Sequence, residues 1–295
     1  MMKVFISVFS FFIIYHCQSQ PFGNTQIHKD NNSLLWEISG NHLSKPSYLF
    51  GTFHLMCKED ILFSENLKAA IKYAQSLYLE MDMDDPSNTF GALMYMNMKD
   101  GITLKDLYSI ENYKKAERFF KDSLHIGLEM FQKMKPEFLS TLLYPMMMPC
   151  KSMDGVEAEL MKLIKADKKQ INGLETIAFQ ASIFDSIPYE MQANSLLNMI
   201  DSIAEFKIRF INMLNIYKSQ HLDEIENSFN EEPGFNDQRE WLLDNRNKAW
   251  VEKLKIIMKE ENIFIAVGAG HLVGEKGLVY LLRKEGYTLK PVNNN

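Results

Sequence analysis

Two apolar runs in the chain end in the same pattern, Gly-x-x-His. Residues 263–267 form an uninterrupted apolar run of strand length, and Gly-Ala-Gly-His follows it up to His271. Residues 47–50 lead in the same way into Gly-Thr-Phe-His, which ends at His54. Because α/β proteins place their chemistry at the ends of such strands, we expect His54 and His271 to meet at one site.

A third strand is predicted over residues 76–83, where apolar and polar positions alternate. Glu80 and Asp82 fall on the face opposite to the leucines and methionines. The segment follows a predicted helix over 60–74, so it has the position of the second strand of a βαβ unit and should be buried. A carboxylate on such a strand favours a functional role. We therefore expect Glu80 to line the site and leave the role of Asp82 open.

The rest of the chain has mainly a helical period, including long helical stretches over 188–230 and 237–260. We predict one α/β domain over 20–295. Its central sheet is built from two βα halves, each with one strand–Gly-x-x-His unit, and a large helical insertion at about 88–260 separates them. Further predicted elements are a β-hairpin over 34–50, helices over 88–98, 111–122, 136–148, 154–166, 176–180 and 274–284, and strands over 169–175 and 287–292.

The charge of the chain argues against one class of partner. The 295 residues carry a net charge of −6, and the basic side chains are dispersed along the sequence. Nucleic-acid binding depends on clustered lysine and arginine, so we expect no nucleic-acid partner. The sequence does not predict the oligomeric state.

The N-terminus has the pattern of a secretory signal peptide. A short basic start precedes an apolar stretch from Val4 to Tyr15, and small residues lie before a cleavage site after Ser19. We therefore predict a signal peptide over 1–19 and a mature protein that is periplasmic or secreted, while an uncleaved N-terminal anchor stays open. No other stretch is long and apolar enough to cross a membrane, so no stable span is expected after cleavage.

The cysteines and methionines give weaker signals. After cleavage Cys57 and Cys150 remain, which permits one disulfide in an oxidising compartment, although two free, buried thiols are the favoured interpretation. The spacing from His54 to Cys57 is a weak metal signature, because further Cys and His ligands are missing nearby. The methionines at 146–148 are typical of flexible core filling rather than of a copper site.

Several short motifs occur together in one order: Leu-Trp-Glu-Ile at 35–38, Tyr-Leu-Phe-Gly-Thr-Phe-His at 48–54, Leu-Glu-Met-Asp at 79–82, Gly-Leu-Glu-Thr at 173–176 with Gln180, Asn-Arg-Asn at 245–247 and Gly-Ala-Gly-His at 268–271. Each motif alone is weak. Together they resemble the TraB/GumN family, which includes the Tiki proteases, over roughly residues 33–293.

The resemblance implies a fold similar to that of erythromycin esterase and ChaN-type proteins, and a metal-dependent hydrolase site. Where the family often has Asp after Gly-Val or Gly-Ile, this chain has Glu157, which puts Glu157 in doubt as a site residue. Which of the carboxylates is ligand and which is base stays open. The residues that the resemblance assigns are His54, His271 and Glu80 as metal ligands, and Glu80, Arg246 and Glu175 as catalytic or site-lining residues.

The predicted function is therefore a metal-dependent hydrolase of the cell envelope, with a peptidase acting on a peptide or small amide as the favoured reaction. Two imidazoles and a carboxylate suit manganese, cobalt or zinc. Arg246 can stabilise an oxyanion that develops during hydrolysis. One alternative is a non-catalytic envelope protein that binds a peptide, haem or metal on the same fold, and another is a hydrolase of esters.

Overall fold

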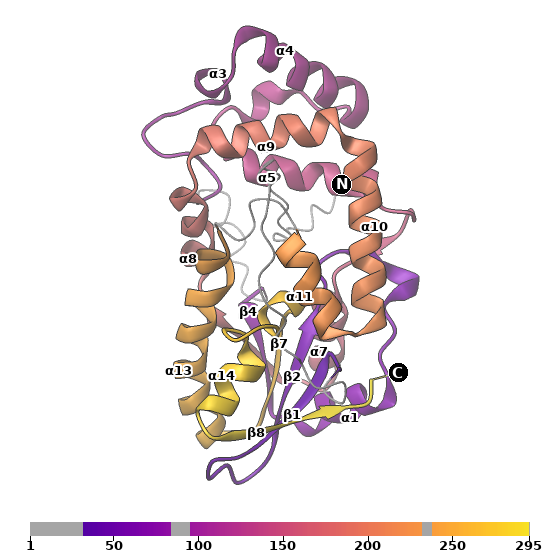
Figure 1. Cartoon of the computed structure of the whole chain (residues 1–295), viewed down its shortest axis with the longest axis vertical. Coiled ribbons are helices and arrows are strands. Elements are labelled where there is room, and N and C mark those ends of the chain that lie inside the picture. Colours follow the sequence, from indigo (N-terminus) through magenta and orange to yellow (C-terminus); the bar gives the residue numbers. More distant parts are fainter. Residues whose placement is uncertain (1–31, 84–94, 232–237, 295) are drawn as a thin grey trace.

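The computed structural model describes residues 32–83, 95–231 and 238–294 (Figure 1). The predicted signal peptide over 1–19 and most of the predicted helix over 88–98 lie outside the described residues. In the described part of the chain, no helix combines the length and the apolar composition that crossing a bilayer requires.

A six-stranded mixed sheet forms the lower half of the molecule in Figure 1, which confirms the predicted α/β class. In spatial order its strands are β6 (Gln170–Glu175), β4 (Ser76–Met81), β7 (Ile263–Gly268), β2 (Ser47–Thr52), β1 (Leu35–Gly40) and β8 (Tyr287–Val292). The first four are parallel neighbours, whereas β1 pairs antiparallel with β2, as the predicted hairpin, and with β8. The parallel part of the sheet therefore gathers four carboxyl ends at one edge.

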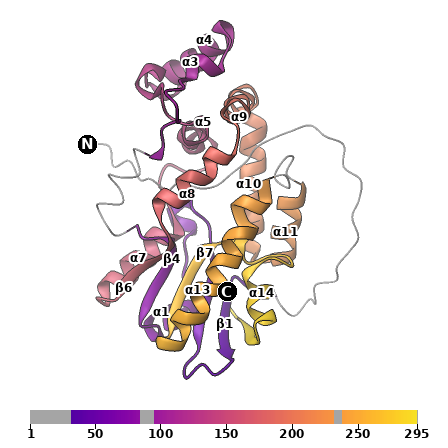
Figure 2. The ribbon, with the colours of Figure 1, turned by 90° about the vertical axis from the view of Figure 1, so that its left-hand side faces the viewer.

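Helices cover both faces of the sheet and form the upper half of the molecule (Figures 1 and 2). They are α1 (Glu65–Tyr73), α3 (Leu104–Leu107), α4 (Ile110–Phe119), α5 (Pro136–Ser140), α6 (Tyr144–Met147), α7 (Val156–Ala166), α8 (Ile177–Ile183), α9 (Tyr189–Asp201), α10 (Ile203–Ser219), α11 (Leu222–Glu231), α13 (Asn245–Glu260) and α14 (Leu278–Lys284), with the short turns η2 (Lys58–Asp60), η3 (Phe120–Leu124), η4 (Leu128–Phe131), η5 (Thr141–Leu143), η6 (Phe184–Ser186), η7 (Glu240–Asp244) and η8 (Ala269–His271). Figure 2 shows α1 and α7 on one side of the sheet and α13 and α14 on the other.

One of the two long predicted helices is confirmed and the other is divided. The described part of the stretch over 237–260, residues 238–260, is helical throughout, with the π-helical turn η7 leading directly into α13. The stretch over 188–230 forms α9, α10 and α11, because the chain leaves helical geometry at Ser202 (φ −122°, ψ 31°) and becomes left-handed at Gln220 (φ 60°). These breaks let α10 and α11 fold back beside the carboxyl end of the sheet (Figure 1).

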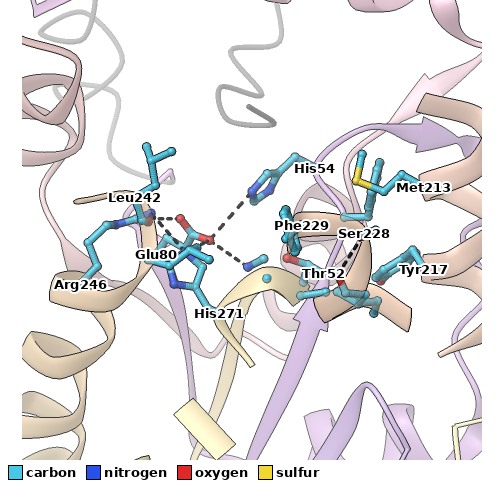
Figure 3. Close-up of a pocket in the computed structure, with 16 residues that line it drawn as sticks. Thr52, His54, Glu80, Met213, Tyr217, Ser228, Phe229, Leu242, Arg246 and His271 are labelled. Carbon is cyan, nitrogen blue, oxygen red and sulfur yellow. Dashed lines mark hydrogen bonds and ion pairs between the residues drawn. The ribbon is translucent and has the colours of Figure 1, made fainter. Parts of the chain in front are cut away.

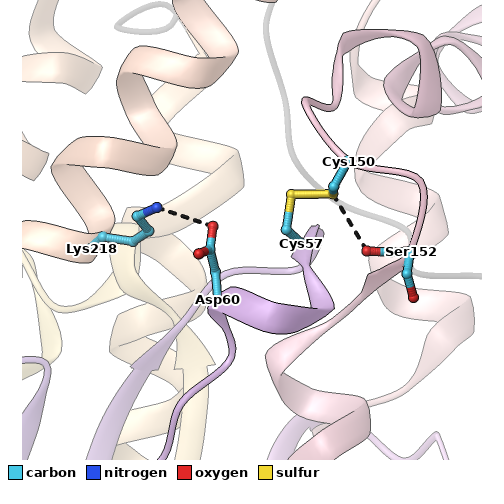
Figure 4. The surroundings of a disulfide bond; sticks show 5 residues. All are labelled: Cys57, Asp60, Cys150, Ser152 and Lys218. Carbon is cyan, nitrogen blue, oxygen red and sulfur yellow. Dashed lines mark hydrogen bonds and ion pairs between the residues drawn. A yellow bond between two sulfur atoms is a disulfide. The ribbon is translucent and has the colours of Figure 1, made fainter.

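Cys57 and Cys150 form a disulfide, so the expectation of two free thiols is wrong (Figure 4). The physical reason is the pairing of the short strands β3 (Met56–Cys57) and β5 (Met153–Asp154), which brings the two cysteine Cα atoms to 5.8 Å. This distance lies in the normal range for a disulfide. Glu59 is close to both sulfur atoms, but the oxidised pair offers no thiolate to a metal ion.

Candidate metal centre

The carboxyl ends of the parallel strands carry the candidate site (Figure 3). Because β2 and β7 are parallel neighbours, His54 and His271 follow adjacent strand ends. Glu80 lies near the end of β4, and Glu175 is the last residue of β6. Residues from distant parts of the sequence thus meet at one edge of the sheet, as the strand pattern predicts for the histidines and Glu80.

Glu80 lies at the centre of this cluster. Its Oε1 atom is 3.9 Å from His54 Nε2 and 3.6 Å from His271 Nε2. Its Oε2 atom accepts hydrogen bonds from Arg246 Nη2 at 2.6 Å and from Gln180 Nε2 at 2.9 Å. Burial acts to raise the pKa of Glu80, but Arg246 and the two histidines outweigh it and hold the pKa well below its usual range. The carboxylate is therefore ionised at neutral pH.

His271 is neutral and carries its proton on Nδ1. Asn247 donates its amide N–H groups to the backbone oxygens of Lys276 and His271, at 2.8 and 3.3 Å, so its Oδ1 atom faces the imidazole. Nδ1 lies 2.7 Å from this oxygen and must be the protonated nitrogen, which leaves a lone pair on Nε2. Burial, reinforced by Arg246 and opposed by Glu80, lowers the pKa of His271 to about 3.

His54 is oriented by Glu157. Its Nδ1 atom is 2.6 Å from Glu157 Oε1, which also accepts a hydrogen bond from the Thr52 hydroxyl. Burial acts to lower the pKa of His54, but the Glu157 carboxylate outweighs it and raises the pKa to about 9. The His54 side chain is 18% exposed, compared with 4% for His271, so it is the more accessible of the two imidazoles.

The sequence left Glu157 in doubt, and the structure places it in direct contact with His54. Glu157 lies in the first turn of α7, which begins close to the site because the Val156 amide donates to the Phe53 carbonyl at 3.2 Å. A Cβ atom at Gly155 would lie 2.7 Å from the His54 carbonyl oxygen, so this approach requires glycine. The longer glutamate side chain therefore does not prevent contact with the histidine.

Arg246 engages all five N–H donors of its guanidinium. Nε and Nη2 donate to Glu175 at 3.0 and 2.6 Å, and Nη2 also donates to Glu80. Nη1 donates to the Leu242 carbonyl at 2.8 Å and to the lone pair of His271 Nε2 at 3.1 Å. Burial acts to lower the pKa of Arg246, but Glu80 and Glu175 outweigh it and raise the pKa above its usual value. The cluster is thus a buried charge network.

Glu175 contacts Arg246 but does not line the cavity that lies next to this cluster. Its Oε2 atom accepts the indole N–H of Trp250 at 3.0 Å, and the guanidinium carbon lies 4.7 Å from the centre of the Trp250 ring system. Trp250 and the histidine partner Asn247 were missed in the sequence. Two signals were available, because Asn247 belongs to the Asn-Arg-Asn motif at 245–247 and residues 246 and 250 lie on the same face of a helix.

The remaining candidate residues lie away from the cavity. Asp82 follows β4 and does not contribute to the cavity wall. His42 is exposed in the turn between β1 and β2, and His125 is exposed at the end of η3. His221 is exposed before α11 and pairs with Glu224 at 3.1 Å. These three histidines are therefore surface residues outside the candidate site.

A cavity of about 100 Å³ lies beside the charge network. His54, Glu80, Arg246 and His271 form a polar part of its wall, and side chains from α10, α11 and η7 form an apolar part (Figure 3). The polar wall carries two imidazoles and a carboxylate, a donor set that manganese, cobalt and zinc accept once His54 has released its Nε2 proton. The arrangement thus combines possible metal ligands, a fixed guanidinium and space for a small ligand group.

Comparison with known proteins gives the same family over most of the chain. Metalloprotease TIKI1 of Danio rerio is 22% identical over 320 residues, which cover 88% of this chain and 63% of that protein. A metalloprotease TIKI homolog of Amphimedon queenslandica is 22% identical over 333 residues, covering 93% and 63%. The chain therefore spans less than two thirds of the length of these relatives, and no solved structure matches it. Because the model of the TraB/PrgY/gumN family matches residues 34–291, the chain belongs to that family.

Proposed function

We propose that this protein is a metal-dependent peptidase of the cell envelope that acts on a peptide or small amide. The observation that carries the proposal is the orientation of the two histidines. An acceptor engages each Nδ1 atom, so His54 and His271 both direct Nε2 towards Glu80 Oε1 at the cavity wall. These three residues would hold a manganese, cobalt or zinc ion. The relatives named as metalloproteases support this reaction class.

The residues present have the chemistry of metal ligands, and two of their three distances suit one ion. Two ligands of one ion lie roughly 3 to 4 Å apart when each metal–ligand bond is about 2.1 Å, and the distances from Glu80 Oε1 to the two Nε2 atoms, 3.6 and 3.9 Å, agree with this. Within the described residues the two Nε2 atoms lie more than 4.8 Å from each other, so an imidazole has to turn towards the other for one ion to contact all three residues. A Cβ atom at Gly268 would lie 3.2 Å from Glu80 Oε1 and 3.3 Å from His54 Nε2, so glycine keeps this space open. Hydrogen-bonded acceptors on both Nδ1 atoms are typical partners of metal-binding histidines.

If His271 binds the metal ion, Arg246 loses one of its hydrogen-bond acceptors. The lone pair of His271 Nε2 accepts an N–H of Arg246 Nη1, and the same lone pair would bind the ion. That N–H then becomes the donor that can face a substrate oxygen in the cavity. Arg246 is thereby placed to stabilise negative charge on a carbonyl oxygen. The metal, when bound, would polarise this carbonyl and lower the pKa of a bound water.

The two carboxylates of the network have different roles in this proposal. Glu80 has a pKa well below its usual range, which suits a carboxylate that holds a cation better than one that takes up a proton. Glu175 does not line the cavity and contacts Arg246 through three short N–O distances of 2.6, 3.0 and 3.3 Å. Glu175 is therefore a positioning residue that acts through Arg246.

The metal content of the purified protein tests the site. After equilibration with Mn²⁺, Co²⁺ or Zn²⁺ and removal of free ion, we expect about one ion per wild-type chain and none in His54→Ala/His271→Ala. Circular dichroism establishes that the variant is folded, and the exposed pair His42→Ala/His221→Ala is the control. Metal retained by the first variant would contradict the ligand assignment. Metal bound without chelator-sensitive cleavage of any peptide would support a non-catalytic binding protein instead.

Replacement of Glu157 with glutamine is expected to weaken metal binding by about 10- to 100-fold, because the histidine it orients loses its charged acceptor. The measurement is the metal dissociation constant by isothermal titration calorimetry. Glu159→Gln, a change two residues further along α7 at a glutamate that pairs with Lys162, is the matched control. Equal affinities of Glu157→Gln and the control would show that Glu157 does not support the site.

The export of the protein and the construction of its sheet from two related βα halves are also part of the proposal. Cleavage after Ser19 would release the mature protein into the periplasm or the medium. The disulfide supports export, because disulfides persist mainly in oxidising compartments. The parallel pairing of β2 and β7 supports the interpretation that the sheet consists of two βα halves with related Gly-x-x-His ends.

A further inference from the structure

The cavity has an apolar part whose chemistry the metal centre does not use. Figure 3 shows Met213 and Tyr217 on the side of the cavity opposite to Glu80 and Arg246. Met213 is only partly buried, so its flexible side chain can adjust to a ligand. The apolar side chains of this part of the wall are Met213 and Tyr217 from α10, Ile225 and Phe229 from α11, and Leu242 and Leu243 from η7.

The polar atoms on the α10 and α11 side are already engaged within the protein. The Tyr217 hydroxyl donates to the Gly51 carbonyl at 3.1 Å, and the Ser228 hydroxyl donates to the Ile225 carbonyl at 2.8 Å. The Thr52 hydroxyl donates to Glu157. A polar ligand group that entered here would therefore lose its water contacts without gaining these donors, which disfavours it. An apolar group would gain from burial.

The apolar wall is attached directly to the backbone of the metal centre. A Cβ atom at Gly270 would lie 2.9 Å from the Phe229 ring, so α11 packs against the residue before His271. Any group bound against this wall is therefore next to the polar wall. The whole cavity, with its polar wall, has a volume of about 100 Å³, which is smaller than the ~150 Å³ apolar cavity that accepts benzene in another protein, so the apolar part has room for a small group only.

We propose that this apolar part is a subsite for one aliphatic side chain, such as leucine or methionine, in a residue that flanks the scissile bond of a peptide substrate. The inference rests on the proposed peptidase function and adds a preference of the enzyme for one class of substrate side chain. The side chains of leucine and methionine each have four non-hydrogen atoms and no hydrogen-bond donor, which suits a small apolar space whose nearby hydroxyl groups are already engaged. Charged side chains would be rejected because they would be desolvated without a partner.

The test uses the full mature chain loaded with Mn²⁺ and internally quenched peptides of glycine and serine. One position, on either side of the cleaved bond, carries Leu, Phe, Asp, Lys or Gly. The kcat/KM for the Leu peptide is expected to be about 10- to 100-fold above those for the Gly and Asp peptides. Met213→Ala enlarges the subsite and is expected to shift the ratio from Leu towards Phe by about tenfold. Ile208→Ala, on the exposed side of α10 at 69% exposure, should leave the ratio unchanged.

Two outcomes separate the subsite from the proposed function. Cleavage that is equally fast for Leu, Asp and Gly peptides, or a ratio that Met213→Ala does not change, would overturn the subsite and leave the peptidase intact. If the metal-loaded protein cleaves no peptide, the proposed function fails. Calorimetric binding of the Leu and Asp peptides then tests the subsite by itself. Tenfold tighter binding of the Leu peptide, lost in Met213→Ala, would support the subsite. Equal affinities would overturn it.

Discussion

Replacing both Cys57 and Cys150 with serine is expected to lower the free energy of unfolding by about 4 kcal/mol. The disulfide joins positions that are 93 residues apart, so its loss restores much conformational freedom to the unfolded chain. Urea unfolding followed by circular dichroism measures the effect. Reducing agent should destabilise the wild type by a similar amount and leave the double variant unaffected. Equal unfolding midpoints of oxidised wild type and variant would contradict the prediction.

The same change is expected to reach the candidate metal centre. His54 lies just before β3 and Glu157 just after β5. These two strands pair with each other, and the disulfide joins Cys57 of β3 to Cys150, which precedes β5. A backbone hydrogen bond from Lys58 to Ser152 at 3.0 Å extends the contact. The disulfide thus fixes the two segments whose side chains form the His54–Glu157 contact. A weaker metal affinity in the double serine variant, measured under folding conditions, would follow from this.

The sequence pattern predicts the parts of the site that depend on local periodicity. β7 and β2 were recognisable as apolar runs before Gly-x-x-His, and their parallel pairing places His54 and His271 at adjacent strand ends. Glu80 was recognisable as a carboxylate on an alternating strand. A short stretch of sequence suffices here. A strand that is buried on one face alternates apolar and polar residues, and a strand that is buried on both faces is an apolar run.

The partners of these residues could not be predicted in the same way. Glu157 and Asn247 orient the histidines from α7 and α13, and no local period indicates which helix will begin or pack beside a given strand end. The disulfide depends on the pairing of β3 and β5, which have only two residues each. Such contacts are set by tertiary packing. Arg246 was identified by family resemblance, since its polar surroundings in the sequence are typical of a surface position.

The divided helices show a related limit. The apolar period continues through Ser202 and Gln220, so periodicity alone joins α9, α10 and α11 into one helix. The breaks are backbone events at single residues, and Gln220 adopts a left-handed conformation that glutamine rarely shows. Without these breaks the side chains of α10 and α11 would not meet at the cavity.

The wild-type protein is expected to become less stable as the pH rises, because Glu137 loses its proton. Replacement of Glu137 with glutamine is expected to abolish this effect. Glu137 on α5 is 4% exposed, and its Oε2 atom has no hydrogen-bond partner within the described residues. Burial raises its pKa to about 8, from 4.5 for an ordinary glutamate. The folded state therefore keeps a proton that the unfolded state has lost between these pH values. The stabilisation by this proton is complete below about pH 4.5 and is lost as the pH rises through about 8.

The expected size of this effect is on the order of 4 kcal/mol between pH 4.5 and 8. Because glutamine does not titrate, the free energy of unfolding of Glu137→Gln should fall less than that of the wild type over this range, and the variant should be the more stable protein at pH 8. Urea unfolding at several pH values measures both curves. Glu190→Gln, an exposed position on α9, is the matched control and should follow the wild type. Parallel curves for wild type and Glu137→Gln would mean that the Glu137 carboxyl is ionised in the folded protein at neutral pH, with a partner that compensates its burial.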